Sequence, residues 1–96
     1  MPNFDVAHIH EQGQDMIIVP MERSFGHLTH QQQAEQAALL QEYASSAGLA
    51  GTVVPVWDAG GGRMAFIAPT PWHSFFGSIS LRFVAMNINR RLTCSG

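Results

Sequence analysis

The chain of 96 residues is 46% hydrophobic and only 12% charged, which suits one compact domain with a modest core and is too short for two. Its net charge of −2 is unevenly divided, because residues 1–58 carry all seven acids and one arginine, whereas residues 59–96 carry four arginines and no acid. A single cysteine excludes an intrachain disulfide, and with no signal-peptide pattern and no run of about 18 apolar residues we expect a cytoplasmic protein that does not enter a membrane.

The first stretch of the chain predicts a hairpin. Residues 4–10 alternate loosely between apolar and polar side chains, which is typical of a strand with one face in a core. A polar turn containing Gly13 separates them from the short apolar run 16–19. Pro20 ends that run, because proline has no amide hydrogen to donate to a ladder.

A helix over residues 29–47 follows the hairpin. Thr29 occupies an N-cap position, and Gln32, three residues later, completes the pattern of a capping box. Glutamine and alanine dominate the segment, and both suit helices. Gly48 suits the left-handed residue that ends a helix, and Leu49 supplies the apolar contact that often follows it.

The second half of the chain predicts another hairpin and another helix. Residues 52–57 are apolar and mostly β-branched, although Pro55 favours an edge strand or a bulge. A glycine turn at 60–62 leads to a returning strand over 63–68, and an aromatic connection follows. Ser80 then caps a helix that we expect to run to about Leu92. The expected core face of this helix comprises Leu81, Val84, Ala85, Ile88 and Leu92.

The halves 1–48 and 49–96 resemble each other in pattern. The stretch Phe25-Gly26-His27-Leu28-Thr29 returns as Phe76-Gly77-Ser78-Ile79-Ser80, each time before a predicted helix. Such likeness suggests one supersecondary unit used twice. We therefore predict a single α+β domain over residues 1–96, with the order ββα-ββα and a four-stranded antiparallel sheet that carries two helices on one face.

Some predicted strands are apolar at successive positions, as in 17–19 and 65–68. Because side chains alternate between the two faces of a strand, both faces of the sheet should be apolar. Helices on one face would leave the other uncovered, so we expect a second copy of the chain or a larger protein to cover it. The separation of acids from arginines also favours self-association.

His8 and His10 are the candidate metal ligands. They are separated by one residue, which places both imidazoles on one face of a strand. The pair would need a third ligand from His27, His30, His73 or an acid. Because two histidines at this spacing occur often by chance, we expect solvated or interface histidines, and neither a metal nor another cofactor.

No arrangement typical of a catalytic site is present in the sequence. Ser74 directly follows His73, so the two cannot form a triad by adjacency, and no nucleophile elbow occurs. Cys94 lies near the chain end, where residues tend to fray, so its thiol would not be held in place as a nucleophile needs to be. The glycines before Arg63 lack the lysine and hydroxyl residue of a phosphate loop, so we interpret them as a turn, with a weak anion site at Arg63 as the alternative. We therefore expect a protein that is not an enzyme.

The outer face of the predicted C-terminal helix is the first candidate binding surface. It presents Arg82, Phe83, Met86 and Arg90. Arginine, methionine and phenylalanine are enriched at protein interfaces, whereas arginine and asparagine can also read base edges in the major groove. Because the whole chain is acidic and shows no helix-turn-helix spacing, we favour a protein interface over nucleic acid.

A second candidate surface is an aromatic pocket for a small molecule, lined by Trp57, Phe66, Trp72 and His73. We predict a non-catalytic binding or regulatory module that acts through protein–protein contacts, as a homodimer or on a larger protein. The alternatives are a nucleic-acid-binding protein that uses the C-terminal helix, and a small-molecule-binding domain or enzyme with the aromatic pocket.

Overall fold

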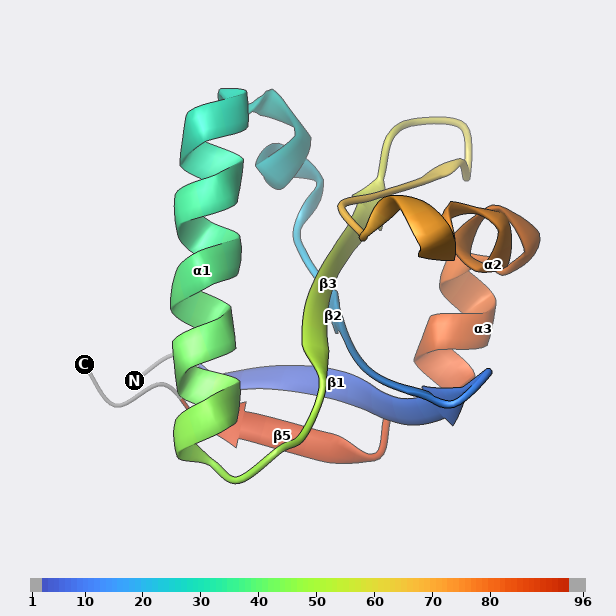
Figure 1. Ribbon diagram of the computed structural model, residues 1–96. Coiled ribbons are helices and arrows are strands. Elements are labelled where there is room, and N and C mark those ends of the chain that lie inside the picture. Colours follow the sequence, from blue (N-terminus) through green and yellow to red (C-terminus); the bar gives the residue numbers. More distant parts are fainter. Residues whose placement is uncertain (1–2, 94–96) are drawn as a thin grey trace.

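The hairpin of β1 and β2 lies inside a mixed five-stranded sheet with the order β4-β3-β2-β1-β5 (Figure 1). The computed structural model describes residues 3–93, so Cys94 and the other residues at 1–2 and 94–96 lie outside the described part. The predicted α+β class is confirmed. The elements are β1 (Asn3–Glu11), β2 (Gln14–Pro20), η1 (Arg23–His27), α1 (His30–Ser46), β3 (Thr52–Asp58), β4 (Met64–Phe66), η2 (Thr70–Trp72), α2 (His73–Ser78), α3 (Leu81–Met86) and β5 (Arg90–Thr93).

Helix α1 begins and ends as the sequence predicts. Thr29 Oγ1 accepts the backbone N–H of Gln32 at 3.1 Å, and Gln32 Oε1 accepts the backbone N–H of Thr29 at 3.0 Å. These two bonds form the capping box and satisfy two amides that the first turn leaves without helical partners. At the other end Gly48 has φ +80°, and the amide of Leu49 donates to Ala44 at 3.0 Å.

We expect Thr29→Ala to lower the free energy of unfolding by about 0.5–2 kcal/mol, because it removes the acceptor for the Gln32 amide. Urea denaturation of the wild type, Thr29→Ala and Thr29→Ser checks this expectation. Thr29→Ser keeps the hydroxyl and should cost much less, so equal losses in the two variants would contradict a capping role.

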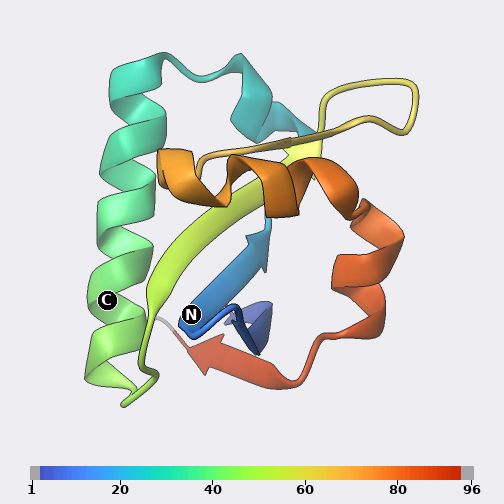
Figure 2. The same ribbon diagram turned by 45° about the vertical axis from the view of Figure 1, so that its right-hand side comes forward.

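Strands β2 and β3 are parallel, so the predicted fully antiparallel sheet is wrong. Their register runs from Met16↔Thr52 to Pro20↔Val56, and Figure 2 shows the two strands running in the same direction. Because α1 carries the chain back along the sheet before β3 begins, it serves as the crossover that parallel neighbours require. The sequence interpretation treated the two hairpins as consecutive antiparallel units and missed this role.

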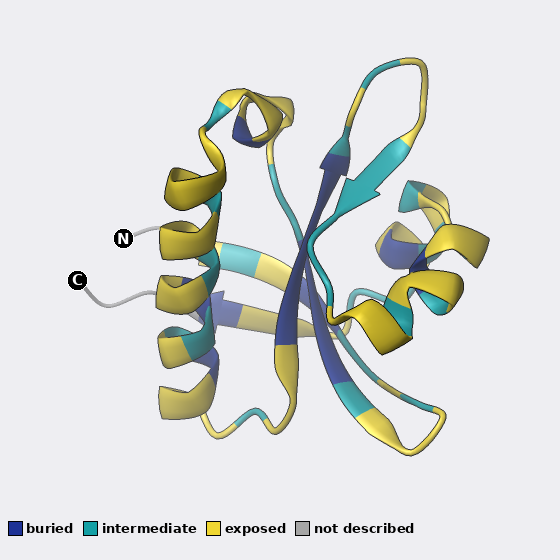
Figure 3. Ribbon diagram, turned by 45° about the horizontal axis from the view of Figure 1, so that its top comes forward, coloured by how far each residue is buried: buried dark blue, intermediate teal, exposed yellow. Residues whose placement is uncertain are grey.

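The helices cover both faces of the sheet, so the prediction that they share one face is also wrong (Figure 3). The sheet is indeed apolar on both faces, but α1 packs on one and α2 with α3 on the other, which removes one ground for expecting a second subunit. The α1-side core contains Val6, Ile17, Val19, Leu40, Ala44, Val53 and Leu92. The α2–α3-side core contains Ala7, Met16, Ile18, Val54, Val56, Phe76 and Val84.

The predicted helix to Leu92 and the predicted repeat are wrong. Ser80 does cap a helix, since its hydroxyl accepts the amide of Phe83 at 3.2 Å, but α3 ends at Met86 and β5 follows. Leu92 is buried in the α1-side core, whereas Val84 is buried in the other core. The apolar residues that the sequence analysis assigned to one helix face therefore belong to two different elements. The second half of the chain has the order ββααβ, whereas the first half has the order ββα.

Candidate functional site

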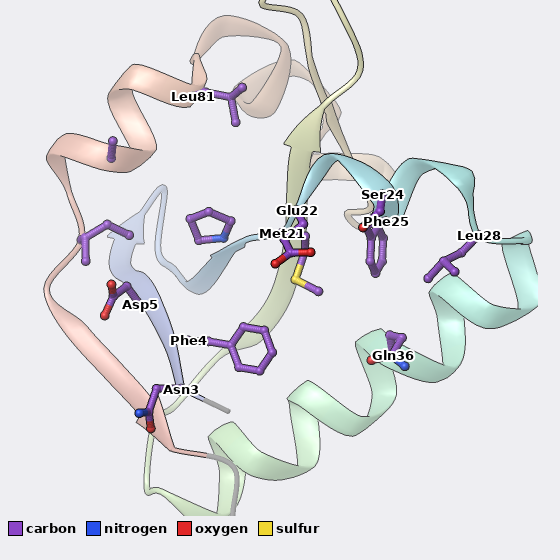
Figure 4. A pocket seen from close by; sticks show the side chains of 13 residues that line it. Asn3, Phe4, Asp5, Met21, Glu22, Ser24, Phe25, Leu28, Gln36 and Leu81 are labelled. Atoms are coloured by element: carbon purple, nitrogen blue, oxygen red, sulfur yellow. The ribbon is translucent and has the colours of Figure 1, made fainter. Parts of the chain in front are cut away.

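A groove with a volume of about 820 Å³ opens where β1 and β2 separate (Figure 4). Its walls come from the start of β1, the end of β2, η1, α1 and α3. Most of the lining side chains are apolar. We call this feature the β1–β2 groove, and it is lined by Asn3, Phe4, Asp5, Pro20, Met21, Glu22, Ser24, Phe25, Leu28, Gln36, Leu81, Ala85 and Ile88.

Pro20 explains why the strands separate. The β1–β2 register begins at Glu11↔Gln14 and ends at Ala7↔Ile18, so Asp5 and Pro20 would form the next hydrogen-bonded pair. Because Pro20 has no amide hydrogen, that pair cannot exchange both bonds, and the ladder ends. Beyond this point β1 continues with β5, whereas β2 continues with β3.

The groove reaches both faces of the sheet. Phe4 packs against the α1-side core, and the groove meets α1 at Gln36. Asp5, the next residue on the strand, belongs to the opposite face by alternation, where the groove meets α3 at Leu81 and Ala85. Figure 4 shows Phe4, Asp5, Gln36 and Leu81 around the groove.

The charged side chains of the lining are both acidic. Asp5 makes an ion pair with Arg91 at 3.3 Å, but both side chains are more than 60% exposed, so the pair contributes little stability. Glu22 makes no ion pair within residues 3–93. The groove therefore combines apolar walls with two solvated carboxylates.

The predicted helical binding face is not assembled. Arg82 and Met86 are exposed on α3, with Met86 at 75%, but Phe83 packs in the α2–α3-side core and Arg90 lies in β5. Asn89 is held by β1 through its side chain. A helix of six residues that ends before Arg90 does not present the continuous face on which the nucleic-acid alternative depended.

The predicted aromatic pocket is divided by the sheet. Trp57 packs on Phe25, with ring centroids 4.9 Å apart, beside a cavity of about 300 Å³ next to η1. Phe66 and Trp72 pack on the α2–α3-side core, and His73 lies edge-on to Phe66 at 5.5 Å. His73 also hydrogen-bonds through Nε2 to the carbonyl of Ala68 at 3.0 Å. Trp57 therefore does not meet the other three residues.

The glycine segment before Arg63 forms the predicted hairpin turn. All three glycines have positive φ, and the amide of Arg63 donates to the carbonyl of Gly60 at 3.1 Å. The amide of Gly60 donates to Asp58 Oδ1 at 2.8 Å, and the Arg23 guanidinium bonds Oδ2 at 2.9 Å. These two partners hold the pKa of Asp58 below its ordinary value. The Arg63 side chain is exposed.

The two candidate metal ligands have separate partners. His8 Nε2 hydrogen-bonds to the carbonyl of Ala50 at 2.8 Å, whereas His10 Nδ1 bonds Asp15 Oδ1 at 2.7 Å across the hairpin. No cluster of three histidine, cysteine or acidic residues suited to a metal occurs within the described part of the chain.

The sequence interpretation missed the β1–β2 groove. It did identify Pro20 as the end of a strand, which is the local signal for the opening. It could not place Pro20 opposite Asp5, because that pairing depends on the register of β1 and β2.

Comparison with protein-family models, with curated proteins and with solved structures finds no match to this chain. Among residues 3–93 no helix has both the length and the apolar character needed to cross a membrane.

Proposed function

We propose that this domain is a non-catalytic binding module that acts through protein–protein contacts and takes its partner in the β1–β2 groove. The observation that carries the proposal is the groove itself. It has a volume of about 820 Å³, and its lining is mainly apolar with a few polar groups, which is typical of protein interfaces with an apolar core and a polar rim.

The chemistry of the lining favours binding over catalysis. Ser24 supplies a hydroxyl to the lining, but none of the described residues that line the groove is a histidine that could act as its base. Asp5 and Glu22 are exposed to water and are not fixed by buried partners, whereas catalytic carboxylates need an environment that holds and tunes them.

Self-association is the second candidate, and the charge distribution favours it. The acids lie in residues 1–58, and four of the five arginines lie in residues 59–96. Arg91 pairs with Asp5 within one copy, but Arg63, Arg82 and Arg90 are exposed and make no ion pair within residues 3–93, so acids of a second copy could pair with them. Sedimentation velocity over a concentration series measures this tendency, and a species that remains monomeric at high concentration would leave a different protein as the partner.

The groove itself is tested by selecting short random peptides displayed on phage against the full chain. Ala85 is exposed and lines the groove from α3, so Ala85→Trp should fill the groove without disturbing the core. Ala38 is exposed on α1 outside the lining, so Ala38→Trp is the matched control. We expect selected peptides to bind the wild type and Ala38→Trp and to lose at least about tenfold in affinity for Ala85→Trp. Selection of no peptide, or equal binding to both variants, would contradict the proposal.

A further inference from the structure

We infer that the occupant of the β1–β2 groove is an extended segment of a partner protein, which adds a strand to β1 at Asn3 and Asp5 and places a basic side chain near Asp5 and Glu22. The inference rests on the proposed function and specifies how the groove holds its partner.

The hydrogen bonds of β1 show which backbone groups face the groove. Val6 accepts the amide of Asn89 at 3.1 Å, and His8 exchanges two bonds of 2.8 Å with the Asn89 side chain, through both its N–H and its C=O. The N–H and C=O of one residue point to the same edge of a strand, and successive residues alternate. Val6 and His8 therefore face β5, whereas Asn3 and Asp5 face the edge toward β2.

At Asn3 and Asp5 that edge borders the groove, because β1 pairs with β2 only from Ala7 to Glu11. A strand edge of this kind can accept an extended peptide, whose main chain provides affinity while its side chains provide specificity. The space between β1 and Pro20 is where such a strand would lie, since both line the same groove.

The walls of the groove define the side chains of that segment. Side chains of an added strand would alternate between the α1 side, at Phe4 and Met21, and the α3 side, at Leu81 and Ile88. These walls suit apolar residues. Glu22, which makes no ion pair within residues 3–93, and Asp5, whose pair with Arg91 is exposed to water, suit lysine or arginine and oppose the phosphates of a nucleic acid or an anionic membrane.

The peptides selected against the wild type provide the probes. Each is synthesised as a series with a single N-methyl group moved along the backbone, which removes one N–H donor at a time. We expect methylation at every second position to weaken binding at least about tenfold, and methylation at the positions between them to have little effect. Uniform tolerance of methylation would overturn strand addition.

Variants of Asp5 test the complementary hydrogen bond, which the Asp5 N–H would donate to a carbonyl of the partner segment. Asp5→Pro removes the N–H that faces the groove and leaves the β5 ladder intact, whereas Asp5→Ala removes only the carboxylate. We expect Asp5→Pro to bind at least about tenfold more weakly than Asp5→Ala. If Asp5→Pro fails to fold in a thermal melt, the N-methyl series decides alone.

The basic residue is tested by charge removal. Asp5→Asn and Glu22→Gln should each weaken binding about two- to fivefold, with a smaller effect at high salt. Selected sequences without lysine or arginine would overturn the cationic partner.

The outcomes separate the inference from the proposed function. Peptides that lose binding to Ala85→Trp but show no alternating N-methyl pattern would keep the groove as the site and overturn strand addition. The wild type could also form a dimer that dissociates when the selected peptides are added and when Ala85 is replaced by tryptophan. That result would assign the groove to a second copy of the chain and would overturn the inference that a different protein occupies it.

Discussion

We expect Phe76→Ala to lower the free energy of unfolding by about 3–5 kcal/mol. Phe76 is 1% exposed and lies in the α2–α3-side core, with the rings of Phe66 and Phe75 at 5.5 and 5.2 Å. Truncation would leave a cavity that these neighbours cannot close fully. Because small domains have roughly 5–15 kcal/mol of stability in total, this one change removes a large share.

Guanidinium denaturation measures the loss, and Phe75→Ala is the matched control. Phe75 is the preceding residue of the same helix and is half-buried, so its truncation should cost clearly less. If both variants lose the same free energy, Phe76 does not have the central position in the core that the structure gives it. The comparison therefore tests whether α2 closes the second face of the sheet.

Helix α2 is an element that the sequence pattern did not predict. Its six residues, His73–Ser78, are too few for a helical periodicity to be recognised, and the aromatic segment was interpreted as a connection. Short helices gain most of their stability from packing and not from propensity, so their presence depends on a surface formed elsewhere in the chain. That surface is the apolar second face of the sheet.

Several local signals in the sequence were reliable, although Pro55 favoured an edge strand or a bulge and β3 lies inside the sheet between β4 and β2. The capping box at Thr29, the glycine that follows α1 and the glycine turn before Arg63 all depend on residues within a few positions of one another. The groove and the parallel pairing depend on how strands that are distant in the sequence are aligned, for example on the β1–β2 register that places Asp5 opposite Pro20. No local pattern specifies which strands become neighbours, so these features could not be predicted.

Gly51→Ala should have the other large effect, a loss of about 2–5 kcal/mol in the free energy of unfolding. Gly51 has φ +121°, a conformation that other residues rarely adopt. A Cβ at this position would also lie 2.5 Å from the carbonyl oxygen of Asp15, which is backbone and cannot rotate away. Gly51 therefore permits the close approach through which β3 begins beside β2, at Met16↔Thr52.

Gly48→Ala separates the two causes in Gly51→Ala. Gly48 also has a positive φ, of +80°, but a Cβ there would meet no atom within 4 Å, so only the conformational cost of about 1–2 kcal/mol is expected. The additional loss in Gly51→Ala measures the clash with Asp15. Urea denaturation of the two variants gives this difference, and equal losses would mean that β3 does not start against Asp15 at the beginning of β2. Because that contact sets the start of the parallel register, the comparison tests the feature of the fold that the sequence failed to predict.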